Sequence, residues 1–365
     1  MCLRALTLGL LLTASVAATA LAAPAPAPAL SSLANLQPAF GKHGNVLISD
    51  QFNNRVIEVN TAGGIVWHFG NGPNDISAHS PVGVNDALRV GDFTLISGTG
   101  APAGTEPKCP SGCPDNRVFF VDRDGHIVWQ YGSFGVTGSG PNQLNTPVQA
   151  TWTPRRTVLI SDQANQRVIE VGLDHHILWQ YGQTGVAGNG PNQLNNPNSV
   201  EMLVNGDLLI ADESNNRAIV VNRNHAIVAS YTAGGTLNGV AFASRLPDGD
   251  ILITDSNNNR VVEVNAQDHI VWAVSTNKQP GSNPNPQPTR AVRLFNGDTV
   301  ISDQFNHRVI VVNHAGAIVN QFGNLNAPGF GLYWTRQGLN GPYDAKVIGD
   351  NTGLTWYPAS SEPGR

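Results

Sequence analysis

One six-residue pattern, Asp-x-x-Asn-x-Arg, brings a carboxylate, an amide and a guanidinium together five times in this chain. A carboxylate beside a guanidinium can form a bidentate ion pair, and Asp and Asn also accept backbone N–H groups in tight turns. Because a catalytic site is seldom needed five times, the pattern predicts a structural part of each repeat, although a ring of such loops could also bind a ligand. The five sets are Asp50/Asn53/Arg55, Asp162/Asn165/Arg167, Asp212/Asn215/Arg217, Asp255/Asn258/Arg260 and Asp303/Asn306/Arg308.

A second group of polar residues is less regular and could do chemistry at one central place. Carboxylate and amide oxygens are the ligands that Ca²⁺ prefers, so Glu201 and Asp344, with Asn198 and Asn238, are candidate ligands for this ion. The sequence leaves open the alternative of a solvated polar lining without any ligand. The candidate binding residues are Gln149, Asn198, Glu201, Asn238, Arg290 and Asp344.

Other signatures of enzyme or nucleic-acid chemistry are missing from the sequence. It has no Gly-x-Ser-x-Gly, phosphate-binding loop or dinucleotide fingerprint. Four of its 10 histidines recur at one turn of the repeat, where they would lie far apart (His126, His176, His225 and His269). The formal net charge is -5 and no block of Lys and Arg occurs. Since clustered basic residues supply most of the affinity for phosphates, nucleic acid is not an expected partner.

The elements that must position these residues follow from the repeat. Each copy, such as Val158–Val171, is a short apolar run, the Asp-x-x-Asn-x-Arg pattern and a second run rich in Val and Ile. From Asp162 onward the aspartates recur at intervals of 50, 43 and 48 residues. A sixth, altered copy begins at Phe93 and ends at Val121, with an insertion at 98–114. This period, with β-branched runs and no helical pattern, predicts an all-β fold: a six-bladed β-propeller of four-stranded blades.

The third repeat shows how one blade is expected to be divided. Its strands, from the innermost outward, are predicted at Val148–Thr153, Thr157–Ser161, Arg167–Val171 and Ile177–Tyr181. A recurring tryptophan of the fourth strand is predicted to pack between blades; its copies are Trp67, Trp129, Trp179 and Trp272.

First strands show a looser pattern, a proline followed three residues later by an apolar residue. The pairs are Pro81/Val84, Pro147/Ala150, Pro197/Val200 and Pro288/Ala291, with Leu237 in place of proline ahead of Val240. A sixth match, Pro342-Tyr-Asp-Ala345, predicts that the C-terminal region supplies the strand that closes the ring in the N-terminal blade. The segment Pro38–Phe40 is the alternative closing strand. The sequence also leaves open the alternative of an incomplete seventh blade. The candidate binding residues then lie on innermost strands, around the central channel.

The ends of the chain predict export. Residues 1–22 have a positive residue, an apolar run and an Ala-x-Ala site, which is typical of a signal peptide, with an uncleaved anchor as the alternative. Residues 23–36 form a Pro/Ala-rich linker, 37–358 the propeller and 359–365 a tail. The close pair Cys109 and Cys113 predicts a disulfide that pins the insertion, and the protein is expected to be secreted or periplasmic.

The pattern Leu/Ile-x-Ser/Ala-Asp-x-x-Asn-x-Arg-Val-Ile/Val-x-Val, as in Val46–Val59, resembles the NHL-repeat β-propellers, in their secreted bacterial type. The element Gly64–Trp67 is also similar, more weakly, to arylsulfotransferase-like propellers. The NHL resemblance implies ligand or protein binding and, in some members, an enzyme such as the peptide-amidating lyase. That lyase holds its metal with central histidines, which the first strands of this chain lack, so its activity is not carried over.

The expected function is non-catalytic: an exported propeller, monomeric and without a membrane span once the signal is removed. It would bind a protein, glycan or small-molecule ligand on the face that carries the Asp-x-x-Asn-x-Arg loops. The alternative is a metal-dependent hydrolase or lyase in the central channel, with Ca²⁺ as the candidate cofactor at Glu201 and Asp344.

Overall fold

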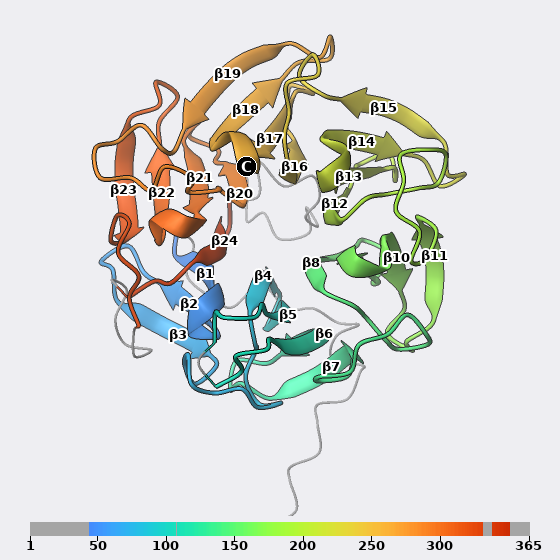
Figure 1. Cartoon of the computed structure of the whole chain (residues 1–365), viewed down its shortest axis with the longest axis horizontal. Helices are drawn as coiled ribbons and strands as arrows, with labels where there is room; N and C mark the ends of the chain where they lie inside the picture. The colour runs from blue at the N-terminus through green and yellow to red at the C-terminus, as the bar shows by residue number, and fades with distance from the viewer. Residues whose placement is uncertain (1–43, 107, 331–337, 351–365) are drawn as a thin grey trace, which may run out of the picture.

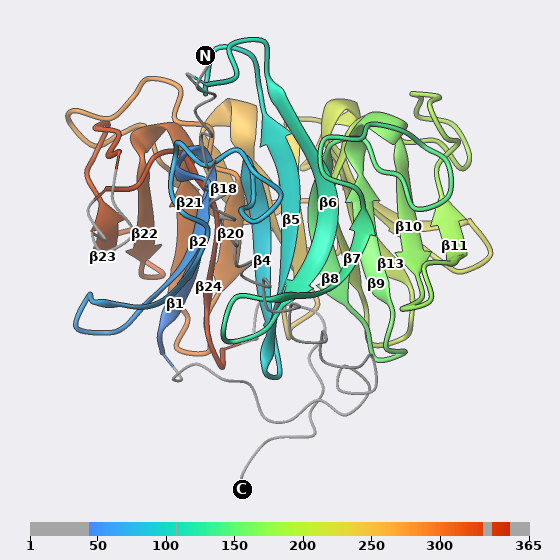
Figure 2. The same ribbon diagram turned by 90° about the horizontal axis from the view of Figure 1, so that it is seen from below.

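Six four-stranded antiparallel sheets stand around a central axis in the computed structural model (Figure 1). The structure describes residues 44–350 apart from 107 and 331–337; the predicted signal peptide, linker and tail lie outside this range. Figure 2 shows the sheets from the side, with their strands running roughly along the axis. This arrangement confirms the predicted six-bladed β-propeller, and the described residues form no seventh sheet. None of their helices is long and apolar enough to span a bilayer.

The blades are numbered I to VI around the ring. Blade I is β24 (Pro342–Val347), β1 (Val46–Asp50), β2 (Arg55–Val59) and β3 (Ile65–Phe69). Blade II is β4 (Val84–Val90), β5 (Phe93–Ala101), β6 (Cys113–Val121) and β7 (Ile127–Gly132). Blade III is β8 (Pro147–Trp152), β9 (Val158–Asp162), β10 (Arg167–Val171) and β11 (Ile177–Tyr181). Blade IV is β12 (Pro197–Met202), β13 (Leu208–Asp212), β14 (Arg217–Val221) and β15 (Ile227–Tyr231).

Blade V is β16 (Val240–Arg245), β17 (Ile251–Asp255), β18 (Arg260–Val264) and β19 (Ile270–Ser275). Blade VI is β20 (Arg290–Arg293), β21 (Thr299–Asp303), β22 (Arg308–Val312) and β23 (Ile318–Gly323). Five 3-10 turns join second and third strands: η1 (Gln51–Asn53), η2 (Gln163–Asn165), η3 (Glu213–Asn215), η4 (Ser256–Asn258) and η5 (Gln304–Asn306). The end of the propeller that carries these turns is called the loop face.

Ring closure occurs through the C-terminal strand. β24 pairs antiparallel with β1, from Val46 opposite Val347 to Asp50 opposite Pro342, as the sixth proline pattern predicted. This pairing covers the inner edge of β1 with a strand from the other end of the chain, so blade I has four strands like the other blades. The competing segment Pro38–Phe40 lies outside the described residues.

The predicted register of two first strands was wrong by three residues. Val84 pairs with Gly98, and Val240 pairs with Asp255, just as Pro147 pairs with Asp162 in blade III. In every blade the residue before this position has a left-handed backbone: Gly83, Thr146, Asn196, Gly239, Gln287 and Gly341. The left-handed residue turns the chain into the strand, whereas the proline after it is optional, so the proline was the less reliable marker.

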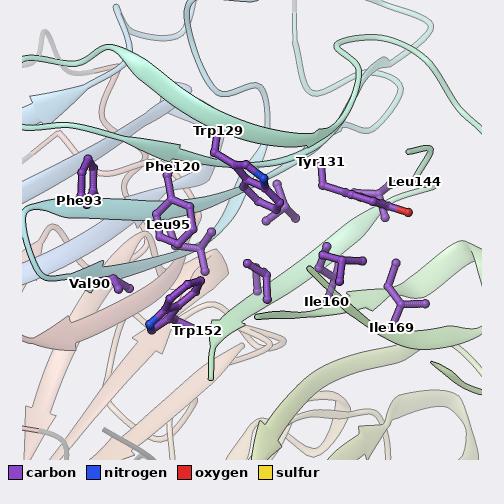
Figure 3. Close-up of a cluster of buried hydrophobic side chains, with 14 residues drawn as sticks. Val90, Phe93, Leu95, Phe120, Trp129, Tyr131, Leu144, Trp152, Ile160 and Ile169 are labelled. Atoms are coloured by element: carbon purple, nitrogen blue, oxygen red, sulfur yellow. The ribbon is translucent and has the colours of Figure 1, made fainter. Parts of the chain in front are cut away.

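Apolar side chains fill the spaces between blades. Figure 3 shows one such cluster, in which Phe120 and Trp129 of blade II pack against Trp152 and Ile160 of blade III. The recurring tryptophans also tie neighbouring blades together by a hydrogen bond: the Trp129 indole N–H donates to the Leu173 carbonyl at 3.0 Å. Trp67, Trp179 and Trp272 make the equivalent contact, so four of the six interfaces combine apolar burial with an indole hydrogen bond between blades.

The Asp-x-x-Asn-x-Arg residues form one compact hydrogen-bonded unit in each of the five blades that carry them. In blade III, Oδ2 of Asp162 accepts from Arg167 Nε at 2.8 Å and from Asn165 Nδ2 at 2.8 Å. Its other oxygen accepts from the backbone N–H of Asn145 at 2.8 Å, in the connector that leads into β8. Asn165 also donates to the Gly138 carbonyl at 2.8 Å. The unit thus ties the turn between the second and third strands to the chain that leads into the first strand of its own blade.

Blade II keeps this carboxylate but takes it from another place in the sequence. Gly98 stands where the other blades have the motif aspartate, opposite Arg117. The Asp115 carboxylate fills that space: a Cβ built on Gly98 would lie 2.3 Å from its Oδ2. Asp115 accepts from Arg117 Nε at 2.5 Å and from the Val82 backbone N–H at 2.8 Å. The altered repeat therefore restores the same ion pair in three dimensions.

The insertion of blade II continues its hairpin. Pairing of β5 with β6 runs on beyond Gly98 to Ala101 opposite Cys113. Cys109 and Cys113 form the predicted disulfide, with Cα atoms 5.7 Å apart, at the tip of this hairpin. The bond closes a short loop and so restricts the part of the hairpin that lies beyond the sheet.

We expect Asp162→Asn to lower the free energy of unfolding by about 3–5 kcal/mol, because Arg167 would stay buried without its counter-charge. Asp255→Asn is the matched control: the side chain of its partner Arg260 is 25% exposed, against 3% for Arg167, and can be hydrated. Urea unfolding of both variants measures the difference, and equal losses would contradict this account.

Candidate functional site

One position of the innermost strand carries a polar or charged side chain in five blades and a phenylalanine in blade V. The six equivalent residues pair with the same position of the second strand and are Asp86, Gln149, Ser199, Phe242, Arg290 and Asp344. All six are buried. They form what we call the inner belt, and three of them (Gln149, Arg290 and Asp344) are among the residues predicted from the sequence.

Side chains of the inner belt reach from one blade to the next. Asp344 accepts from the backbone N–H of Ala87 at 3.2 Å, and Gln149 accepts from that of Val200 at 2.6 Å. Asp86 and Ser199 make the same kind of contact with the blades that follow them. Phe242 breaks the series, and Arg290 lies over its ring at 4.1 Å from the centroid. The belt therefore closes on itself by hydrogen bonds, one cation–π contact and the ion pair of Arg290 with Asp344.

Two carboxylates of the inner belt are neutralised by two cations. Arg290 donates to Asp86 at 2.9 Å and lies 2.6 Å from an oxygen of Asp344. Lys346 bridges the same carboxylates, at 2.7 Å from Asp86 and 2.5 Å from Asp344. Each carboxylate is thus shared by two cations, as buried charges require. These ion pairs join blades of the ring, so the burial of Arg290 and Asp344 near the axis is explained without a ligand.

A second polar layer lies above the inner belt on the loop face. We call it the mouth cluster, and its members come from five blades: Gln51, Asn85, Gln163, Asn198, Glu213, Gln304 and Tyr343. Its side chains are linked by hydrogen bonds in two chains. The first runs from Gln304 through Gln51 to Asn85, with both donor–acceptor distances 2.7 Å. The second runs from Gln163 to Glu213 and from Asn198 to Glu213, with both distances 2.9 Å.

Tyr343 spans the ring within the mouth cluster. It lies on β24, whereas its partner Asn198 lies on β12, and these strands face each other across the axis (Figure 1). Asn198 Nδ2 donates to the phenol oxygen of Tyr343 at 3.0 Å. Burial raises the pKa of Tyr343 above its ordinary value, so the phenol stays protonated. Tyr343 therefore joins opposite blades directly above the charged pair of Arg290 and Asp344.

Glu213 is the acidic member of the mouth cluster. Its Oε2 accepts both amide hydrogen bonds, from Gln163 and from Asn198. The side chain is partly exposed on the loop face. Burial raises the pKa of Glu213, and the hydrogen bonds from the two amides only partly offset this effect. The mouth thus holds one carboxylate in a surrounding of neutral amides and a phenol.

The remaining predicted residues occupy different places. Glu201 lies buried on β12 two residues beyond the inner belt, and its charge raises the pKa of Arg290 together with Asp344 and Asp86. We expected Asn238 on an innermost strand. The structure places it in the exposed connector ahead of β16. The three-residue register error described above placed it wrongly, so it does not join Asn198, Glu201 and Asp344.

The predicted calcium site stays a prediction. In the described residues, two groups of acidic and histidine side chains approach closely enough to share an ion, Asp122/Asp124/His126 and Asp248/Asp250/Glu263, and neither includes Glu201 or Asp344. Since Lys346 and Arg290 already neutralise Asp344, a metal ion there would have to displace a cation. We therefore expect EDTA to leave the melting temperature unchanged; a melt lowered by EDTA and restored by Ca²⁺ would contradict this.

The sequence held a signal for the residues that we missed. The first residue after the motif aspartate is Gln51, Gln163, Ser256 or Gln304 in four repeats, and Glu213 in the fifth. A charge at a position that is otherwise neutral marks one repeat as different. The contact between Tyr343 and Asn198 had no such signal, because 145 residues separate them.

Comparisons with known proteins support the fold. No protein-family model matches the chain, and no curated protein matches its sequence. A protein of unknown function from Bacteroides caccae is 15% identical, with a TM-score of 0.52 over 77% of this chain and 93% of that one. Virginiamycin B lyase from Staphylococcus aureus is 13% identical, with a TM-score of 0.51 over 79% and 83% of the two chains. A chain of the nidogen/laminin complex is 10% identical, with a TM-score of 0.51 over 82% and 97%.

At these identities the likeness shows the fold alone, and neighbours with such different names carry no single function. The chain is therefore a six-bladed β-propeller with propeller-type structural neighbours. Membership of the NHL-repeat family stays a prediction.

We expect Glu213→Gln to raise the melting temperature at pH 7. Because the pKa of Glu213 in the folded protein lies above its ordinary value of 4.5, the folded state favours the protonated acid, and the native protein loses stability as pH rises through that range. Glutamine keeps the amide contacts without the charge. The difference in melting temperature between the variant and the native protein should vanish below about pH 4, where Glu213 is protonated in both the folded and the unfolded state. Melting curves from pH 3.5 to 8 measure it; a destabilised variant at pH 7 would contradict the argument.

Proposed function

We propose that this protein is an exported binding protein whose ligand seat is the mouth cluster on the loop face. The observation that carries this proposal is the convergence of Gln163, Asn198, Glu213 and Tyr343 from three blades on one partly exposed, hydrogen-bonded patch. A few polar groups that converge at the mouth of a ring of strands are typical of ligand sites. The fold does not need the hydrogen bond between Asn198 and Tyr343 of opposite blades, because the inner belt below already closes the ring.

The composition of the mouth cluster favours recognition over catalysis. Amide side chains present both donors and acceptors, which suits selective binding of a polar small molecule or an exposed polar group of a larger partner. The phenol of Tyr343 is protonated, because burial raises its pKa, and no nucleophilic thiol or histidine belongs to the cluster. Export is supported by the disulfide Cys109–Cys113, which is typical of oxidising compartments.

A thermal-shift screen of the purified protein tests this function. Amines, amino acids, sugars and nucleosides serve as probes, and a compound that binds the folded state raises the melting temperature. Every stabilising compound is then tested on Asn198→Ala. We expect this variant to lose the effect, because Asn198 holds both Glu213 and Tyr343.

We expect the Asn198→Ala variant to fold, because blade V carries alanine, Ala241, at the equivalent position. Asn205→Ala, in the exposed turn at the opposite end of blade IV, is the control and should respond as the native protein does. Binding that survives in Asn198→Ala, or a screen without any stabilising compound, would contradict a small-ligand seat at the mouth.

A further inference from the structure

Glu213 departs from its repeat in a way that the fold does not require. The 3-10 turns of the other blades begin with Gln51, Gln163, Ser256 and Gln304, all neutral. The backbone is the same in each: the residue that ends the turn is left-handed, with φ of 54° at Asn216 and 57° at Gln166. Since glutamine or serine serves this position in four blades, the carboxylate of blade IV has no evident structural purpose.

Glu213 also differs from the other carboxylates around the axis in having no cation beside it. Asp86 and Asp344 below it each contact both Arg290 and Lys346. The described residues offer Glu213 only the two amides, which both donate to Oε2. Its Oε1 accepts no hydrogen bond from them. A partly buried carboxylate without a counter-ion costs free energy, which a cationic ligand would recover.

The surroundings of Glu213 suit an organic cation better than a metal ion. Sites for Ca²⁺ usually combine several carboxylates, whereas the mouth cluster has one. Asn198 adds an amide oxygen and Tyr343 an aromatic ring, on which an ammonium or guanidinium group can rest by cation–π attraction. The neutral amides of Gln163 and Gln51 would hold polar neighbours of that group without repelling its charge.

We propose that the mouth cluster binds the ammonium or guanidinium group of an organic cation, with Glu213 as the counter-ion and Asn198 and Tyr343 as its neighbours. This assignment rests on the proposed ligand seat and adds the charge of the ligand. Glu213 acts by direct contact with the cation, and its substitution should change affinity without disturbing the ring, because four repeats do without the charge.

A fluorine NMR titration tests the charge of the ligand. The chain has 6 tyrosines, which can be replaced by 3-fluorotyrosine, and the Tyr343→Phe variant assigns the resonance at the mouth. The probes are benzylamine, benzyl alcohol and benzoate, which share one ring and differ in charge. We expect benzylamine to shift the Tyr343 resonance saturably, with a Kd at least about tenfold lower than those of the other probes, the effect of one charge-assisted hydrogen bond.

Glu213→Gln should raise the Kd of benzylamine by about tenfold and leave that of benzyl alcohol unchanged. Asp92→Asn, an exposed carboxylate on blade II, controls for net charge and should bind benzylamine as the native protein does. The fluorine spectra themselves show that each variant is folded.

The outcomes separate the charge assignment from the ligand seat. If benzyl alcohol or benzoate binds at Tyr343 more tightly than benzylamine, the ligand is not a cation, but the mouth cluster is still a ligand site. Saturable shifts by Ca²⁺ alone would also overturn the assignment to an organic cation, in favour of a metal ion. If no probe moves the Tyr343 resonance, both the cation assignment and the proposed seat fail.

Discussion

The buried ion pair between aspartate and arginine is the contact on which each blade depends. In blade III the Asp162 carboxylate joins Arg167, Asn165 and the backbone ahead of β8, so one charged group holds the turn, the third strand and the start of the first strand together. A buried pair is costly when one partner is lost. Blade II shows how strict this need is, because Asp115 supplies the carboxylate that Gly98 cannot.

Closure of the ring adds a second constraint, which acts between blades. The inner belt links neighbouring blades through side chains that accept backbone N–H groups, and its charges balance as Asp86 and Asp344 against Arg290 and Lys346. These residues are deeply buried and form ion pairs with one another. Polar side chains near the axis of a propeller can thus serve the architecture, and their presence alone is weak evidence for catalysis.

Function is better sought where the repeat is broken without structural need. Gly98 breaks the repeat and is compensated by Asp115 in the same place. Glu213 breaks it and receives no compensating cation from the described residues, while it faces the loop side among neutral amides. The fold explains the first departure, and the ligand that we propose would explain the second. This distinction is what directs attention from the channel interior to its mouth.

The sequence by itself determined the blade number, the strands of blade III, the closing strand near Pro342 and the disulfide, because these depend on local patterns that recur or on near neighbours. It did not determine the starts of the first strands in blades II and V, where a left-handed glycine, not a proline, sets the register and displaces Asn238 from the channel. Only the tertiary structure decided which polar residues meet. Tyr343 and Asn198 touch because the ring places the first and fourth blades opposite each other, a relation that no spacing along the chain expresses.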